Sequence, residues 1–587
     1  MASFRQASNL IFFDFIWHTS NVRGIMPPVV NALSSRRRLI AITGFALLGA
    51  LLMSACQSGE GPVQSGTLPA TKGDVSLTVV PPTPFQSIAR TPTTSVINLW
   101  LSPGLPEEIR TRVVDLVDHG VGGFQLTGEP STAQVRVEPG GEVQIAEWVY
   151  ALVAPFPTVE DGMSYESLRA LWAGEAQEGR RMFLSEETFD VMADVLGTPS
   201  GSCVYITAPE DLLDLTWEER PAYAIVPFED LEPRWKVLEL DGQSPIRKNF
   251  DREVYPLIAS FGTSGDPEAT EQLRAGLDTP FSNHDPNKLT TLVMTGVTAL
   301  TRATAWRMET RGIGYPGELI GELLREADFT HVSNEVPFVS ECPDPQPVQE
   351  KLKFCSDPEY IQLLVDLGID LVELTGNHVL DYGSDELIFT LDHYRQHGME
   401  YFGGGEDLDD AFRAVRVEHN GNRLAFLGCN QIGPKYAWAT DEKPGAAPCN
   451  WERLGEELRI LAEDGYLSIF TFQWAELGAP SPAQEDAFRE AIDAGAVITS
   501  GSQAHQPLGF AFHNGGFIHF GLGNLFFDQM QTDELRQEFI DRHVFYDGRH
   551  ISTELLTALL ENYAQPRPMS LAERSALLER IFADSGW

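Results

Sequence analysis

The stretch LGIDLVELTGNHVLDYG, residues 367–383, decides the fold of the larger part of this chain. Its apolar run predicts a buried β-strand that stops at Gly376, Asn377 and His378, and a helix is expected from Asp385. Polar residues directly after a buried strand are typical of α/β sheets, which build their sites at the carboxyl ends of strands. The stretch therefore predicts an α/β fold with a site at this strand end.

Five further stretches repeat this arrangement, each a predicted strand that runs into polar or ionisable residues. They are residues 289–294, the segment that ends at Asn334 and Glu335, LSIFTFQWAE (467–476), AVITSGSQAH (496–505) and GGFIHFGLGNLFFDQ (515–529). Helical patterns separate several of them, and strands that alternate with helices indicate an α/β architecture.

In order and spacing, these stretches resemble the CapA family of poly-γ-glutamate capsule proteins over residues 289–564. GNHVLDYG (376–383), FGGG (402–405) and FGLGNLFFD (520–528) carry the resemblance. It implies a metallophosphoesterase-like α/β/β/α sandwich in which Asp, Asn, Glu and His hold two divalent cations. Metals held in this way can deprotonate a water molecule and clamp two phosphoryl oxygens.

Three positions depart from the family pattern. The Gly-Asp pair that would supply a metal-binding carboxylate is here Gly296-Val297, and valine cannot bind a cation. Gln473 stands where the family has the histidine of His-Trp-Gly, and Gln503 replaces the first histidine of Gly-x-His-x-His. With one carboxylate and two imidazoles replaced, we expect at least one of the two ions to be lost.

The residues that remain have roles implied by the same resemblance. His378 is the candidate catalytic residue, as a general acid or as a group that stabilises phosphoryl oxygen, because imidazole titrates near neutral pH. The candidate metal ligands are Glu335, Asn377 and His505, for one divalent cation (manganese or a similar ion) or none. The candidate substrate-binding residues are Asn334, Gln473 and Gln503. The alternative is that these side chains only hydrogen-bond loops at the strand ends.

Residues 95–263 form a separate α/β pattern. The stretches 147–175 and 222–245 resemble type 2 periplasmic substrate-binding proteins, the phosphate-binding group in particular. No phosphate-cradling loop accompanies them, so the resemblance does not name a ligand, and a generic α/β accessory domain is the alternative. The polar segment 264–288 is expected to be a linker, and residues 565–587 a C-terminal tail helix.

The N-terminal region carries an export signal. Three arginines (36–38) precede an apolar run (39–53), and Ser54 and Ala55 precede Cys56, in the order of a secretory signal with a lipobox. Residues 1–56 are the expected signal region, with Met26 the expected true start and Cys56 the lipidated residue; an uncleaved anchor is the alternative. Residues 57–94, rich in Gly, Ser, Pro and Thr, are the expected flexible linker. The protein is therefore expected outside the cytoplasm, attached to the cell membrane.

The cysteines agree with an oxidising compartment. Two pairs, Cys342 with Cys355 and Cys429 with Cys449, each bracket a short segment and suit local disulfides, although four cysteines allow three connectivities. Cys203 is left over, and its apolar flanks predict an inert thiol on a buried strand.

The charge balance limits the partners. With 42 basic and 84 acidic residues the net charge is −42, so we expect no nucleic-acid partner. An acidic polymer would also be repelled unless it met a local basic patch or a cation.

Two functions follow. The first is an exported lipoprotein for biosynthesis or anchoring of a capsule polymer, with a degenerate metallophosphoesterase-like site acting on an acidic polymer or a phosphorylated envelope component. The second is a non-catalytic envelope receptor or assembly protein that binds a small anionic ligand. The sequence leaves open whether the chain is an enzyme.

Overall fold

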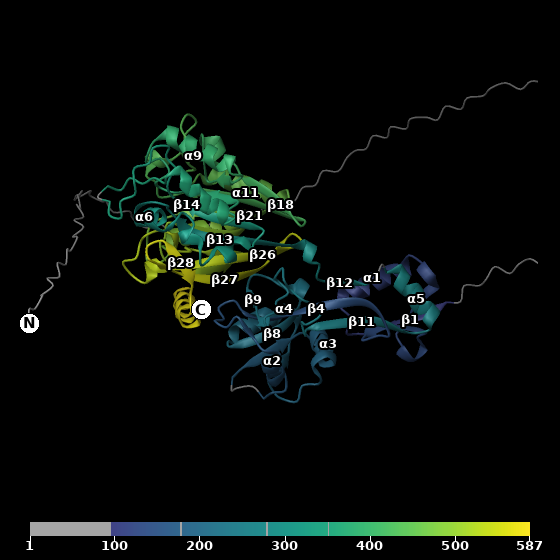
Figure 1. Ribbon diagram of the computed structural model, residues 1–587. Coiled ribbons are helices and arrows are strands. Elements are labelled where there is room, and N and C mark those ends of the chain that lie inside the picture. The colour runs from purple at the N-terminus through teal and green to yellow at the C-terminus, as the bar shows by residue number, and fades with distance from the viewer. Residues whose placement is uncertain (1–95, 176–178, 278–279, 350) are drawn as a thin grey trace, which may run out of the picture. The chain divides into compact units, whose positions relative to one another are not determined.

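The computed structural model describes residues 96–587 except 176–178, 278–279 and 350 (Figure 1). The expected signal region, Cys56 and the linker 57–94 lie outside the described residues. The described residues belong to one compact unit. Within the described ranges, none of the helices has both the length and the apolar character needed to cross a bilayer.

The first lobe is built on a ten-stranded sheet around one long strand, β4 (Val143–Pro155), which is buried along most of its length. The remaining strands of its main path are β2 (Phe124–Leu126), β1 (Ile97–Leu101), β3 (Val135–Pro139) and β11 (Ile258–Gly265) on one side of β4, and β8 (Ala222–Pro227), β6 (Arg181–Leu184) and β7 (Val204–Ile206) on the other. Its helices are α1 (Glu107–Asp118), α2 (Tyr165–Trp172), α3 (Glu186–Leu196), α4 (Pro209–Glu218) and α5 (Pro267–Gly276). The expected α/β class is confirmed for this lobe.

The expectation that residues 264–288 form a linker is wrong. β11 continues to Gly265, α5 begins at Pro267, and the short strand β12 (Phe281–Ser282) returns to pair with β4. The polar residues that suggested a linker start the helix: the Asp266 side chain accepts the Ala269 N–H at 2.9 Å, and Pro267 takes the first helical position.

Cys203 also differs from expectation. The strand that follows it, β7, lies at the end of the sheet order, and Tyr205 and Ile206 are 43% and 53% exposed. The thiol is free but only partly buried, because an edge strand has one side without a neighbouring strand. It is therefore not the fully buried core thiol that its apolar flanks predicted.

The second lobe contains two stacked sheets. The first follows the order β16 (Glu400–Phe402), β15 (Leu371–Glu373), β14 (Phe329–Asn334), β13 (Leu289–Thr298), β26 (Gln537–Tyr546), β27 (Arg549–Glu561) and β28 (Gln565–Pro568), with β25 (Asn524–Phe526) also paired to β13. The second follows the order β18 (Val415–His419), β19 (Asn422–Asn430), β21 (Leu467–Gln473), β22 (Ala496–Ser502), β24 (Gly516–His519) and β23 (Phe510–His513).

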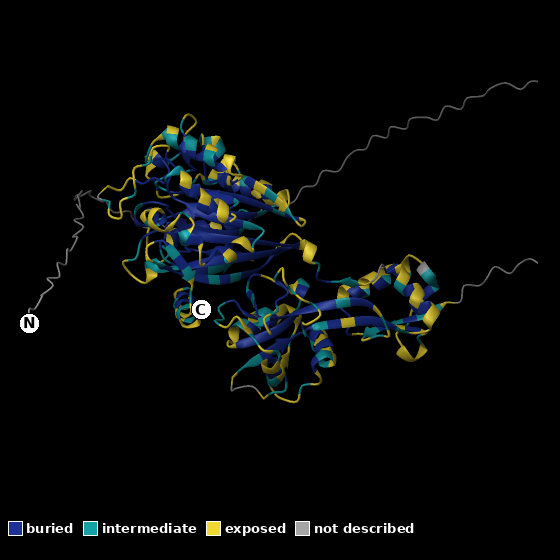
Figure 2. Cartoon of the chain, in the orientation of Figure 1, coloured by how far each residue is buried: buried dark blue, intermediate teal, exposed yellow. Residues whose placement is uncertain are grey.

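Alternation along the strands explains the stacking. Met294 of β13 lies in one hydrophobic cluster with Phe426 and Ile469 of the second sheet, whereas its neighbour Val293 lies in the cluster that holds the first sheet's helices. Because both faces are covered, the central strand β13 is buried throughout (Figure 2).

Helices cover the two outer faces. They are α6 (Arg302–Arg311), α7 (Gly321–Arg325), α8 (Ile361–Asp366) and α9 (Ser384–Gln396) beside the first sheet, and α11 (Trp451–Glu463) and α12 (Pro482–Asp493) beside the second. This is the expected α/β/β/α sandwich. The segment expected as a C-terminal tail helix contains β28 and then α13 (Leu571–Asp584).

Candidate functional site

The carboxyl ends of β15, β21 and β22 meet at one edge of the sandwich, where the two sheets touch through polar side chains. The Ser502 hydroxyl lies 2.9 Å from Glu373 Oε1, and the Gln473 side-chain amide donates to Asn377 Oδ1 at 3.3 Å. The sequence therefore located the edge of the fold where strand-end side chains gather. We refer to this group of side chains as the strand-end site.

The amide side chains at the strand-end site are hydrogen-bonded within the protein. Gln473 donates to Asn377, and its Oε1 accepts from Ser502 Oγ at 3.0 Å. Asn334 donates to the Val336 carbonyl at 2.9 Å and to the Tyr394 hydroxyl at 2.5 Å. Gln473 and Asn377 are thus placed at the site with several polar atoms already partnered, whereas the Asn334 side chain bonds Val336 and Tyr394 of α9 instead.

His505 and Gln503 gather around a residue that the sequence did not single out. Gln503 Nε2 donates to Glu476 Oε1 at 2.8 Å, and His505 Nε2 lies 3.8 Å from the same oxygen. His505 Nδ1 is 2.8 Å from Asn524 Oδ1, and its ring stacks on Phe527 with 4.9 Å between centroids. Gln503 Oε1 is buried without a partner in this structure. Glu476 follows β21 in the stretch LSIFTFQWAE, so its position at a strand end was the signal that could have found it.

His378 is oriented by a carboxylate. Its Nδ1 lies 2.8 Å from Asp381 Oδ2, which also accepts the Phe354 N–H at 2.8 Å. Burial lowers the pKa of His378, but the hydrogen bond to Asp381 and the negative charges of Glu335 and Asp381 outweigh it, so the pKa is raised above its ordinary value. With Nδ1 held by Asp381, Nε2 is the nitrogen left to meet a ligand.

Arg302, the first residue of α6, is the main site residue that the sequence reading missed. Its guanidinium pairs with Asp528, whose other oxygen accepts the Ala303 N–H at 2.9 Å. The guanidinium carbon also lies 4.9 Å from the ring centroid of Phe354 and 4.7 Å from that of Phe527. Its positive charge opposes protonation of His378. The pair was not predictable because Arg302 and Asp528 are 226 residues apart in the chain.

Backbone conformation is unusual at the same place. Arg302, Gln503 and His505 have φ of 47°, 74° and 45°, in the left-handed region that side chains disfavour. Among the described residues, only Tyr563 joins them once Gly, Asn and Asp are set aside. Such positions cost about 1–3 kcal/mol each and tend to occur at functional sites. The fold therefore maintains a strained arrangement here although three expected ligands are replaced.

The residues present do not fit a two-metal centre. Within the part of the chain that the structure describes, no group of three or more His, Cys, Asp or Glu side chains is arranged to hold a metal ion. Val297 is buried at the expected carboxylate position, and Gln473 and Gln503 are hydrogen-bonded to protein groups. Glu335 is 4% exposed and close enough to raise the pKa of His378. A role for Glu335, Asn377 and His505 as ligands of a single ion stays a prediction.

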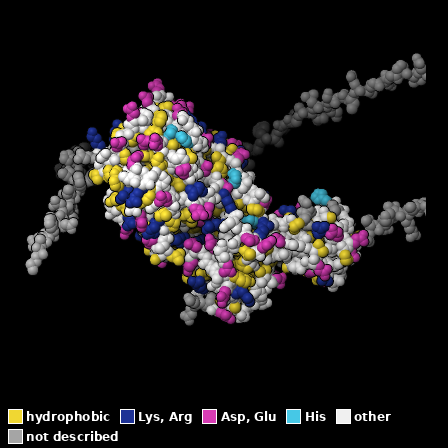
Figure 3. Space-filling view, viewed as in Figure 1, with side chains coloured by type: hydrophobic (Ala, Val, Ile, Leu, Met, Phe, Trp, Pro, Cys, Tyr) yellow, Lys and Arg dark blue, Asp and Glu magenta, His cyan; other side chains and the backbone are white. Residues whose placement is uncertain are grey.

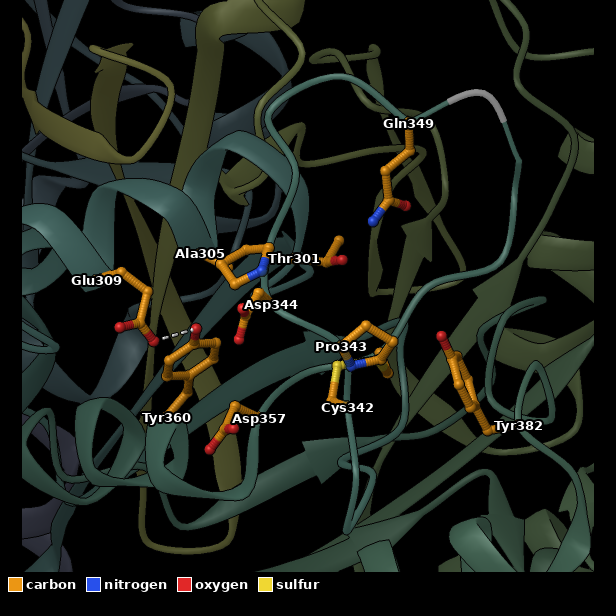
Figure 4. Close-up of a pocket in the computed structure, with 12 residues that line it drawn as sticks. Thr301, Ala305, Glu309, Cys342, Pro343, Asp344, Gln349, Asp357, Tyr360 and Tyr382 are labelled. Carbon is orange, nitrogen blue, oxygen red and sulfur yellow. Dashed lines mark hydrogen bonds between the residues drawn. A yellow bond between two sulfur atoms is a disulfide. The ribbon is translucent and has the colours of Figure 1, made fainter.

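Two disulfides crosslink the second lobe. Cys342 is bonded to Cys355, and Cys429 to Cys449, which confirms the expected pairing. A cavity of about 50 Å³ lies against the first disulfide, and Figure 4 shows Thr301, Tyr382 and the hydrogen-bonded pair Tyr360–Glu309 around it. Its ionisable lining is acidic: Glu309, Asp344 and Asp357.

The first lobe holds a cavity of about 580 Å³ near the ends of β6 and β8. Carboxylates of Glu187, Asp230 and Glu232 line it, together with Arg234, which pairs with Asp214 at 2.7 Å. A lining of this charge does not form a phosphate cradle. On the face shown in Figure 3, Lys and Arg side chains are interspersed with Asp and Glu.

Comparisons with known proteins find a family match within the second lobe. Residues 291–529 match the model of the family described as bacterial capsule synthesis protein PGA_cap. The chain is 26% identical over 326 residues to the capsule biosynthesis protein CapA of Bacillus anthracis, covering 54% of this chain and 78% of that protein. It is 23% identical over 243 residues to the PGA biosynthesis protein CapA of Bacillus subtilis (strain 168), covering 41% and 64%.

Solved structures similar to this chain include a transport receptor and a nucleotidase precursor. An ABC-type phosphate transport receptor from Vibrio cholerae has 12% identity and a TM-score of 0.27, covering 31% of this chain and 93% of that chain. A 5'-nucleotidase precursor from Thermus thermophilus has 14% identity and a TM-score of 0.30, covering 50% and 59%.

Proposed function

Because residues 291–529 match the model of the bacterial capsule synthesis protein PGA_cap family, we propose that the protein is an exported lipoprotein for the biosynthesis or anchoring of an acidic capsule polymer. In this proposal Cys56 carries the lipid, residues 57–94 are the tether, and the described lobes work outside the cytoplasmic membrane. The polymer is poly-γ-glutamate or one of similar chemistry.

The proposed role of the strand-end site is to bind an anionic group without two-metal hydrolysis. The observation that carries this proposal is the pairing of the amides: Gln473 is hydrogen-bonded at both ends, to Asn377 and Ser502. A metal ion would have to break these bonds to use the amide oxygens. The groups left to act on a ligand are the cationic Arg302 and His378 and the carboxylate of Glu335.

This set of groups suits an acidic polymer with amide links. Arg302 attracts a carboxylate and, beside its pair with Asp528, has Nε without a partner, while the raised pKa of His378 favours donation from its imidazole. Glu335 next to them would repel a bare anion, but it can accept a hydrogen bond from an amide N–H. Poly-γ-glutamate offers a carboxylate and an amide N–H in every unit, so it satisfies both kinds of group.

The lysines of the second lobe provide local positive charge that can attract an acidic polymer, although the net charge of the chain is −42. Between residues 289 and 587 the lysines are Lys351, Lys353, Lys435 and Lys443, all in the loops that follow β14 and β19. Lys353 lies 4.0 Å from the ring centroid of Tyr382, which directly follows Asp381. Carboxylates such as Asp441 and Glu442 are mixed with them, so we expect weak, salt-sensitive binding.

The test is binding of poly-γ-glutamate oligomers of defined length to the mature protein in EDTA, measured by calorimetry. Arg302→Ala should weaken binding about tenfold or more, since a charge-assisted contact contributes about 1.5–3 kcal/mol. Arg459→Ala is the matched control, because Arg459 is an exposed residue of α11 whose ion pair with Glu456 spans 3.5 Å. The proposal is supported if the wild-type protein binds the oligomers in EDTA and Arg459→Ala binds them with the same affinity as the wild type.

The opposite result would be equally clear. If the purified protein holds manganese or a similar ion stoichiometrically, loses it in His378→Ala, and hydrolyses a phosphodiester, the site is a working metallophosphoesterase centre and the proposed binding role is wrong. Failure of the wild-type protein to bind the oligomers would also contradict it.

A further inference from the structure

The loop between β14 and α8 is crosslinked next to the strand-end site. The Cys342–Cys355 disulfide joins positions 13 residues apart, with 6.0 Å between the Cα atoms. The chain between the cysteines lies at the surface, where Val348 and Leu352 are 87% and 77% exposed. Phe354, directly before Cys355, is by contrast only 3% exposed. The loop thus has a free outer part and one residue inserted into the protein.

Phe354 touches both cationic groups of the site. Its ring centroid is 4.9 Å from the guanidinium carbon of Arg302 and 4.7 Å from the ring centroid of His378. Its N–H donates to Asp381, the carboxylate that also holds His378. The far side of the guanidinium lies over Phe527, at 4.7 Å. Phe354 therefore forms a wall shared by Arg302 and His378.

The segment around Phe354 is fixed by backbone hydrogen bonds as well as by the disulfide. Ser356 N–H donates to the Pro337 carbonyl at 2.9 Å, and the Val339 N–H donates to the Ser356 carbonyl at 3.1 Å. These bonds hold the chain after Cys355. On the other side, Lys353 rests on the Tyr382 ring at the surface. The disulfide is the covalent link that keeps the exposed part of the loop from pulling Phe354 away.

We propose that Phe354, held in place by the Cys342–Cys355 disulfide, is a positioning residue that sets the arrangement of Arg302 and His378 in the strand-end site. An aromatic face attracts a guanidinium electrostatically and fixes its plane, and groups held before a ligand arrives bind it better than mobile ones. The inference rests on the proposed function only for what the site binds; the arrangement itself can be measured without a ligand.

The first test compares Phe354→Leu, which keeps apolar volume but removes the ring, with Phe354→Tyr, which keeps the ring. The readout is the NMR signal of the Arg302 Nε–H, which lies in the ring current of Phe354, together with hydrogen exchange of the Ala303 amide. The Leu variant should shift the Arg302 signal and speed exchange at Ala303, and the Tyr variant should restore both. Equal behaviour of the two variants would overturn the proposal.

The second test removes the crosslink. Cys342→Ser with Cys355→Ser should produce the Arg302 shift seen in Phe354→Leu and weaken oligomer binding about tenfold. Cys429→Ser with Cys449→Ser is the matched control: this disulfide packs in the cluster around Phe470 and Phe472, so its loss should lower the melting temperature without moving the Arg302 signal. An unchanged Arg302 signal in the first double variant, or an equal shift in both, would contradict the proposed role.

The two proposals fail in different ways. If the wild-type protein binds no oligomer but the Arg302 signal responds to Phe354 and to the disulfide as expected, the proposed ligand is wrong and the positioning role stands. If the wild-type protein binds the oligomer and neither change affects Arg302, the positioning role is wrong.

Discussion

Two groups of buried polar residues in the second lobe differ in the partners of their titratable side chains. At the strand-end site, charged side chains are paired: Arg302 with Asp528 and His378 with Asp381. Deeper between the sheets, where His519 and Asp541 also form a pair at 2.6 Å, two titratable residues contact neutral partners. His543 Nδ1 lies 2.9 Å from the Thr553 hydroxyl, and Glu538 accepts the Gly296 N–H at 3.0 Å.

The difference appears in the pKa values. Burial raises the pKa of Glu538 well above its ordinary value, and it lowers the pKa of His550 to about 3. Burial therefore favours the neutral forms of Glu538 and His550, whereas at His378 the hydrogen bond to Asp381 and the charges of Glu335 and Asp381 outweigh burial and raise the pKa above its ordinary value. We infer that a buried titratable group is held uncharged where its partners are neutral, as at Glu538 and His550, and stays ionisable where a counter-charge is in contact.

The largest expected effect comes from breaking a pair at the site. Asp528→Ala leaves the Arg302 guanidinium without its counter-ion and removes the acceptor of the Ala303 N–H, so the free energy of unfolding should fall by about 3 kcal/mol. Urea unfolding measures this. The control is Asp486→Ala, an exposed partner 4.0 Å from Arg489, which should change stability by less than about 0.5 kcal/mol. Equal losses in both would remove the distinction between the site and the surface.

An intermediate effect, with the opposite sign, is expected at Glu538. Because its pKa is raised in the folded state, the folded protein binds a proton that the unfolded chain releases above about pH 4.5, and stability falls as the pH rises from there by about 1.4 kcal/mol per unit. Glu538→Gln keeps an acceptor for the Gly296 N–H and removes this loss. The variant should therefore be more stable than the wild type at pH 7, by an amount that shrinks towards pH 4.5.

Urea midpoints of the two proteins between pH 4.5 and 8 test this expectation. A variant less stable than the wild type at pH 7 would mean that Glu538 is charged in the fold, and the contrast with the site would fail.

The smallest effect is expected at His550 near neutral pH. Its pKa is lowered to about 3, so the unfolded chain binds a proton below about pH 6.5 that the folded protein does not, and stability is lost as the pH falls. Between pH 6.5 and 5.5 this amounts to about 1 kcal/mol. His550→Gln should flatten that part of the pH profile, measured by thermal unfolding. Parallel profiles for the variant and the wild type would show that His550 is not held neutral.

Much of the fold could be predicted because the relevant patterns are local. A buried strand followed by polar residues, as in residues 367–383, marks both the strand and the edge where it ends. Cysteine spacing likewise predicted the two disulfides. The segment 264–288 was misread since a helix cap, Asp266 before Pro267, has the same composition as a linker.

The site was predicted less completely, and for a physical reason. Asn334 and Gln473 were found because they end strands, and His378 because it lies in the loop that follows β15. Arg302 is a candidate site residue only because it contacts Asp528 and Phe354 in the folded protein. Arg302 and Asp528 are 226 positions apart, so no local sequence pattern predicts their contact. The hydrogen bonds of the Gln473 side-chain amide could not be predicted either, since they join residues from different strands and loops.

The crosslinked loop before α8 has a consequence for proteolysis. Its exposed stretch between Cys342 and Cys355 is the kind of segment that proteases cut. After one cut there, the two fragments would stay covalently joined through the disulfide, with Phe354 still seated on the fragment that carries α8. A nicked molecule would run as one band on a gel without reductant and as two bands with it, while its folded core stays intact.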